Sequence, residues 1–198
     1  GKDVTLIARG EHLKKIQKQG LTLEKMWDKT EENISIPATD MEHYAEHPEY
    51  FEDLKVWQDP LCRMRFGQIP VISVSFGSCK GIDYAHSIRG MLNSLKAMYS
   101  SQDDLLTSER LEEDDRNEFK EIREALFRGE ETVVENSIPI LCRLVYKHYG
   151  VKPVILLDEY DTPLLEAYVG GYWEEMIASC RGLFHNTFKE NEWFERAI

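Results

Sequence analysis

The stretch that decides the fold is Val154-Ile155-Leu156-Leu157-Asp158-Glu159-Tyr160-Asp161. Its four consecutive aliphatic residues predict a short strand that is buried in a sheet. Three carboxylates lie among the next four residues, where that strand ends. In a parallel sheet, the carboxyl ends of the strands form the crevice that holds a ligand. A rigid strand would therefore hold these acids at one defined place.

The same run has the form of a Walker B motif, in which two consecutive acids follow a buried strand. In that interpretation Asp158 holds Mg²⁺, usually through water, and Glu159 orients the water that attacks the γ-phosphate of a nucleotide. A structural interpretation stays open beside it. Asp161 and Thr162 suit the cap of a helix that has Pro163 at its first position, so capping accounts for part of the acidic cluster.

The sequence around this run alternates strands with helices. Residues 71–76 predict a second apolar strand, and we expect both strands in the interior of the sheet. Apolar residues recur every three or four positions over residues 82–98, 133–149 and 172–189, which predicts three helices. Strands that are joined by helices imply crossover connections and a parallel sheet, so the fold class is α/β.

Composition excludes several classes of protein. The 198 residues include 36 acids and 24 bases, a net charge of −12, which argues against a general binder of nucleic-acid backbone. Much of the acidity lies in residues 109–131, where interspersed apolar residues predict a helix with a solvated face. The aliphatic runs are too short for a membrane span, and we find no signal peptide. The four cysteines form no C-x-x-C pair, which favours reduced thiols and a cytoplasmic location.

A nucleotide site of the Walker type also needs a phosphate-binding loop, G-x-x-x-x-G-K-[ST], and the sequence contains none. The nearest candidate is Gly77-Ser78-Cys79-Lys80-Gly81, in which the lysine precedes the glycine and Ile82 follows in place of a hydroxyl residue. We interpret this segment as a strand-to-helix turn. Without the backbone cradle, Asp158 and Glu159 alone would bind triphosphate weakly, because carboxylates repel phosphate unless a metal lies between them.

The N-terminal segment carries a weaker signal for a dinucleotide. Residues 4–8 predict a short strand, Arg9-Gly10 follow it, and residues 11–19 predict a helix. In dinucleotide-binding folds, an arginine in this position suits the 2′-phosphate of NADP. No G-x-G-x-x-G occurs anywhere in the chain, and a solvated arginine is the alternative interpretation of Arg9.

One further pattern suggests a metal. His43-Tyr44-Ala45-Glu46-His47 fits H-x-x-E-H, a zinc-peptidase pattern that places both imidazoles on one face of a helix. Pro48 would end that helix at once. We therefore favour an exposed polar helix end over a zinc site.

From about residue 50 onward the chain resembles the AAA-ATPase-like family, bacterial and archaeal proteins that often carry a nuclease-like domain after the ATPase. The resemblance rests on four stretches in a fixed order: residues 51–57, residues 69–76, residues 154–163, and Gly171-Tyr172 with residues 181–184 and 189–191. It implies that residues 49–198 form an incomplete P-loop-type parallel sheet, with ATP and Mg²⁺ as cofactors and with Asp158 and Glu159 as the Walker B pair. The family's Walker A loop would precede Phe51 and is absent, and the chain stops at Ala197-Ile198, where the family continues into its next core strand and a polar sensor residue.

Residues 1–48 are instead similar to a Rossmann-like strand–helix piece of ketopantoate reductase, an NADP-dependent enzyme. That resemblance would assign Arg9 to the 2′-phosphate of NADP. The glycine loop, catalytic lysine and substrate domain of that family are absent from this sequence. Each resemblance thus covers a nucleotide-binding fold without its phosphate-binding loop.

These features lead to three hypotheses for function. The first is a partial ATPase domain, ancestrally active in Mg-ATP hydrolysis but close to inactive by itself. The second is a non-catalytic protein-interaction module, and the third is an NADP-binding reductase fragment. A sheet that lacks a central strand exposes unpaired edges, so we also expect a protein partner that completes the sheet.

Overall fold

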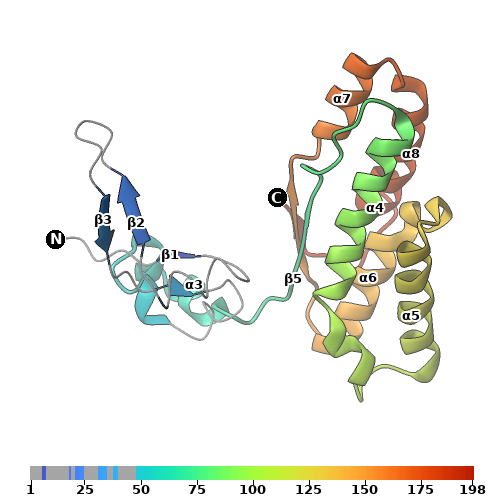
Figure 1. Cartoon of the computed structure of the whole chain (residues 1–198). Coiled ribbons are helices and arrows are strands. Elements are labelled where there is room, and N and C mark those ends of the chain that lie inside the picture. Colours follow the sequence, from blue (N-terminus) through green and yellow to red (C-terminus); the bar gives the residue numbers. More distant parts are fainter. Residues whose placement is uncertain (1–5, 8–17, 19–20, 25–30, 35–37, 40–47) are drawn as a thin grey trace. The chain divides into compact units, whose positions relative to one another are not determined.

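A computed structural model of the chain describes residues 6–7, 18, 21–24, 31–34, 38–39 and 48–198. The chain divides into two compact units, Gly1–Gln68 and Ile69–Ile198 (Figure 1). The boundary that we expect between residues 48 and 49 concerns family similarity rather than compactness, and it stays a prediction. Arg9 and the His43–His47 motif lie outside the described residues, as does the helix expected over residues 11–19 except at Lys18, which is helical.

The first unit contains short elements. Its strands and helices are β1 (Leu6–Ile7), β2 (Leu21–Glu24), β3 (Glu31–Ile34), β4 (Ala38–Thr39), the 3₁₀ helices η1 (Pro48–Phe51) and η2 (Lys55–Gln58), and α3 (Pro60–Arg65). β1 pairs with β4 in parallel, and β2 pairs with β3 antiparallel. The rings of Phe51, Trp57 and Phe66 pack together, with centroids 4.7 to 6.0 Å apart. Asp59 caps α3, because its carboxylate accepts a hydrogen bond from the Leu61 N–H at 2.8 Å.

The second unit is an α/β fold with an open parallel sheet. Its elements are β5 (Val71–Ser75), α4 (Tyr84–Ser100), η3 (Asp103–Thr107), α5 (Glu113–Arg128), η4 (Glu131–Val133), α6 (Val134–Tyr149), β6 (Val154–Asp158), α7 (Thr162–Gly170), α8 (Trp173–Phe188) and β7 (Arg196–Ala197). The strand order is β5-β6-β7, and both pairings are parallel. The incomplete parallel sheet expected from the sequence is therefore confirmed. β7 is the third strand of this sheet and pairs with β6 at Val154 and Ile155.

One face of the sheet carries the core. Ile72 and Val74 of β5 and Ile155 of β6 are buried, and Figure 1 shows the helices of this unit gathered on one side of the sheet. The alternate β5 residues, Val71 and Ser73, are exposed. The expectation that both strands are interior is confirmed for β6 alone. It is wrong for β5, which alternates in burial and is an edge strand among the described strands.

The helices follow the apolar periodicity of the sequence. Helix α4 begins two residues later than the pattern suggests, because Asp83 caps it through the His86 N–H at 2.9 Å. Gly150, in the left-handed conformation at φ 74°, ends α6. The acidic segment forms α5, whose buried side includes Phe119 and Leu126. Among the residues that the structure describes, no helix is both long and apolar enough to cross a membrane.

Candidate functional site

The candidate site lies where β5 and β6 end side by side. Because the two strands are parallel and in register, Ser75 and Asp158 are direct partners at their carboxyl ends. The Ser75 Oγ donates a hydrogen bond to Asp158 Oδ2 at 3.0 Å. The Phe76 N–H donates to the Asp158 carbonyl at 2.9 Å, which extends the ladder by one residue. Backbone pairing with β5 thus fixes the main chain of Asp158, and the hydrogen bond from Ser75 orients its carboxylate.

Glu159 is held by an unusual backbone conformation. Its φ is +49°, in the left-handed region, and it is the one non-glycine residue with a positive φ in the described chain. Its carboxylate lies over Gly77: a Cβ on that glycine would approach Glu159 Oε2 to 2.7 Å. The Thr162 Oγ1 donates a hydrogen bond to the same oxygen at 3.3 Å. The two acids therefore lie over the end of β5, beside one another and exposed to solvent.

The capping interpretation accounts for little of this cluster. Asp161 occupies the N-cap position of α7, with Pro163 in the first turn, as the sequence suggests. Its side chain makes no capping hydrogen bond, however, and the Leu164 and Leu165 amides bond to its backbone carbonyl instead. The Thr162 hydroxyl is directed to Glu159. The carboxylates of Asp158 and Glu159 are therefore not used to cap the helix.

The segment after β5 is a strand-to-helix turn, as predicted, and two of its backbone N–H groups already donate to oxygens of the chain. The Gly77 N–H is directed to the Ser75 Oγ at 3.4 Å, and the Cys79 N–H to the Phe76 carbonyl at 2.9 Å. The carboxylate of Asp83 already occupies the N-terminus of α4. A helix N-terminus that is capped by a carboxylate repels a second anion.

The side chains at the candidate site can supply some of the ligands of Mg²⁺ but not all of them. Asp158, Glu159 and Ser75 supply only oxygen ligands, which are the ligands that Mg²⁺ prefers. Within the described part of the chain, no group of three or more His, Cys, Asp and Glu side chains could hold a metal by itself. Mg²⁺ commonly binds one or two carboxylates, several waters and the phosphates of a substrate. The residues therefore fit an ion that arrives with a nucleotide, and do not form a complete metal cage.

The structure also reveals a Ser-His-Asp cluster that spacing alone does not reveal. His148 contacts the Ser108 Oγ through Nδ1 at 2.7 Å and Asp104 Oδ2 through Nε2 at 3.4 Å. Ser108 is buried, and its Oγ also accepts a hydrogen bond from the Arg110 N–H at 3.3 Å. A nucleophile needs to be accessible to its substrate, so we interpret this cluster as a link between η3 and the end of α6.

Comparison with known proteins supports one family. Residues 38–198 match the AAA-ATPase-like family, described as "Predicted AAA-ATPase". Searches of the curated proteins and of the solved structures found no match. The resemblance of residues 1–48 to ketopantoate reductase gains no support from these comparisons. The match covers most of the chain and includes both strands that form the candidate site, so this protein belongs to the AAA-ATPase-like family.

Proposed function

We propose that this chain supplies the magnesium- and water-binding edge of an ATPase site, with Asp158 as the residue that holds Mg²⁺ and Glu159 as the residue that orients water. One observation supports this most: the two acids are consecutive at the carboxyl end of the middle strand of a parallel sheet, in a member of an ATPase-like family. Ligands of open α/β sheets bind at this end of the strands.

Asp158 is suited to a metal because its orientation is already fixed. The hydrogen bond from Ser75 takes only part of the capacity of one carboxylate oxygen, and a carboxylate offers about four lone-pair sites. Ser75 therefore orients the group while other sites stay available to a metal or to its waters. Bound Mg²⁺ would neutralise charge on the phosphates of ATP.

Glu159 is suited to a water molecule rather than to the metal. Its backbone has a left-handed φ just after β6, and Thr162 donates a hydrogen bond to its carboxylate, which lies close to Gly77 at the end of the neighbouring strand. A carboxylate so placed can accept a hydrogen bond from water and direct the oxygen lone pair toward a phosphate beyond it. This role needs a fixed position more than it needs burial.

The chain by itself is expected to hydrolyse ATP at close to the background rate. Its sequence has no phosphate-binding loop, so the backbone N–H groups and the lysine that bind triphosphate must come from elsewhere. We propose that a protein partner adds a strand beside β7, whose only neighbour among the described strands is β6. An apolar groove adjoins that edge, lined by Leu157, Tyr160, Phe184, Phe188, Ala197 and Ile198. The partner's strand would align its carboxyl end with Asp158.

The test measures binding of Mn²⁺-ATP, with Mn²⁺ as the paramagnetic substitute for Mg²⁺, by relaxation of water protons. We expect weak binding by the unchanged chain, loss of that binding in Asp158→Asn, and little change in the matched control Asp161→Asn. Equal binding by the Asp158→Asn variant and the unchanged chain would refute the assignment. Hydrolysis well above background that is lost in both Asp158→Asn and Glu159→Gln would instead refute the predicted inactivity.

The non-catalytic alternative is favoured by the same free edge and apolar groove. It predicts a stable partner that is captured without nucleotide and is unaffected by Asp158→Asn. The third hypothesis, NADP binding through Arg9, stays a prediction, because Arg9 is outside the described residues. A titration that leaves NADPH fluorescence unchanged would eliminate it.

A further inference from the structure

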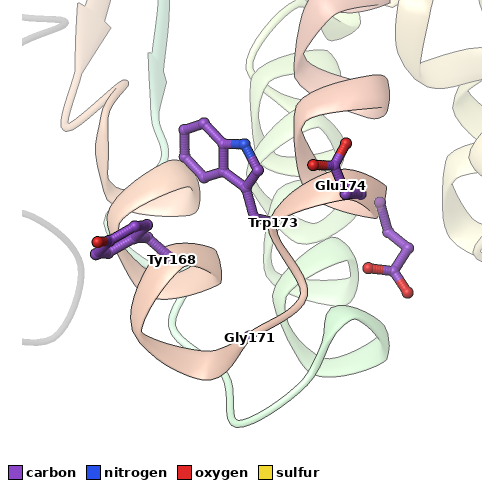
Figure 2. A pocket seen from close by; sticks show the side chains of 5 residues that line it. Tyr168, Gly171, Trp173 and Glu174 are labelled. Carbon is purple, nitrogen blue, oxygen red and sulfur yellow. The ribbon is translucent and has the colours of Figure 1, made fainter.

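A second surface, separate from the acids of β6, lies at the turn between α7 and α8. Gly171 adopts a left-handed φ of 77° and reverses the chain after α7. Tyr168, Gly171, Trp173, Glu174 and Glu175 line an open hollow at this turn, which we call the aromatic–acidic hollow. Figure 2 shows Tyr168 on α7 and Trp173 at the start of α8, with the chain turning at Gly171 between them.

Two aromatic rings form adjacent walls of the hollow. The centroids of Tyr168 and Trp173 lie 6.2 Å apart, and their planes are nearly perpendicular at 86°. Tyr168 is 76% exposed and Trp173 is 36% exposed, so both rings are accessible. The face of an aromatic ring carries negative potential and its edge carries positive potential, so a cation would bind over an exposed ring face rather than at an edge. Such a corner suits a cation better than an anion.

The acidic residues around the hollow also favour a cation over an anion. Glu174 and Glu175 lie in the first turn of α8, where acids also stabilise the helix N-terminus. Residues 153–180 contain six Asp and Glu residues and no Lys, Arg or His. Helix stabilisation explains the two glutamates of α8 but does not explain why the aromatic rings beside them are exposed.

Exposed apolar residues extend the surface along α7. Leu165 is 59% exposed and Val169 is 86% exposed, and Leu165 lies three residues before Tyr168 and four before Val169, so it neighbours both on the surface of α7. Contiguous exposed apolar side chains next to polar groups are typical of protein-interaction sites. An aromatic centre with a charged rim is also typical of protein–protein interfaces.

We propose that the aromatic–acidic hollow binds a lysine or arginine side chain from a basic segment of a partner protein, while Leu165 and Val169 contact apolar groups of the same segment. Charge complementarity selects this occupant. A second copy of this chain carries a net charge of −12, which makes it a less favourable occupant of an acidic surface than a basic segment is. The proposal does not depend on nucleotide binding.

The experiment titrates the full chain with short fluorescein-labelled peptides in which lysine, or in a second probe arginine, alternates with alanine, and follows fluorescence anisotropy. We expect saturable binding to at least one probe, weakened about fivefold by Tyr168→Ala, in line with loss of a cation–π contact. Neutralising both rim glutamates in the double variant Glu174→Gln/Glu175→Gln is expected to weaken binding further. A peptide with glutamate in place of the basic residue should not bind.

A matched control separates this site from general attraction to an acidic protein. The double variant Glu121→Gln/Glu124→Gln removes the same charge from exposed positions of α5 and should leave binding unchanged. Equal weakening by this control and by the rim variant would overturn the proposal. It would also fail if neither basic probe binds, or if sedimentation shows a dimer that Tyr168→Ala dissociates.

Discussion

Gly90 offers a direct test of how closely α4 packs against the turn that leads away from the site. A Cβ at this position would meet the Ser78 carbonyl oxygen and would lie 2.8 Å from the Cys79 Cα. Both are backbone atoms, so neither can rotate away. The same contact is supported by hydrogen bonds from the Ser78 Oγ to the Gly90 carbonyl at 3.2 Å and from the Ser87 Oγ to the Cys79 carbonyl at 2.9 Å.

Two effects of Gly90→Ala oppose each other. Alanine is favoured over glycine in a helix interior by about 1 kcal/mol. Forcing an extra carbon against fixed neighbours costs about 1 to 3 kcal/mol, and weakening the two hydrogen bonds adds about 1 kcal/mol each. The unfavourable terms are larger, so we expect Gly90→Ala to lower the free energy of unfolding by about 2 to 4 kcal/mol.

Gly182, inside α8, provides the matched control. A Cβ there would meet the side chain of Glu135, which is exposed and can turn into solvent. Gly182→Ala should therefore retain the helix-propensity gain of up to about 1 kcal/mol. Urea unfolding followed by circular dichroism measures both variants, with the m value as a check that the unfolding reaction is unchanged. If Gly90→Ala stabilises the protein as much as Gly182→Ala does, the close approach of α4 to the turn is incorrect.

Two other features can be tested in the same preparation. Cys62 is the one exposed cysteine, and burial raises the pKa of the three other thiols, that of Cys142 to about 12. A thiol reagent near neutral pH should therefore modify one thiol in the folded protein and four after unfolding. Rapid modification of more than one thiol in the folded protein would contradict this. Burial raises the pKa of the Asp115 carboxyl, but hydrogen bonds from Lys147 and Arg143 outweigh it and hold the pKa below its usual value. The stabilisation from Asp115 is therefore complete above its unfolded pKa, near 4, and is lost as the pH falls through the lower folded pKa. Asp115→Asn should cost about 2 kcal/mol at neutral pH, measured as a fall in melting temperature that shrinks in acid; a deficit independent of pH would contradict the ion pairing.

The sequence is enough to predict the strand of the site but not its neighbour. Four aliphatic residues followed by acids predict β6, which the structure confirms, and make Asp158 and Glu159 the candidate site residues, because burial and the strand-end rule are local properties. Ser75 was missed, since its contact with Asp158 depends on the register between strands that are 83 residues apart. The sequence does contain one signal for Ser75. It is a polar residue near the end of an apolar strand, and it belongs to the alternate positions of β5 that are exposed.

Other differences between the sequence-based predictions and the structure arise from tertiary contacts, which the periodicity of apolar residues does not reveal. Ile82 fits the apolar repeat of α4 but is 83% exposed, because the carboxylate of Asp83 caps the helix just after it. The one-sided burial of β5 depends on where the helices pack, which periodicity in a five-residue strand cannot determine. The aromatic–acidic hollow depends on the left-handed turn at Gly171, which brings together rings from two helices.

The backbone at Glu159 bears on why the acid is there. A left-handed conformation costs a residue with a side chain about 1 kcal/mol relative to glycine, and asparagine or aspartate tolerates it better than glutamate does. Glu159 gains one hydrogen bond, from Thr162, and that bond at an exposed site offsets the cost only in part. Local stability alone would therefore favour glycine at this position. The strain is consistent with a carboxylate that serves a ligand, because strained residues cluster where a group must be held in one place. Glu159→Gly should accordingly unfold at a higher urea concentration than the unchanged chain, and a lower midpoint would contradict the inferred strain at Glu159.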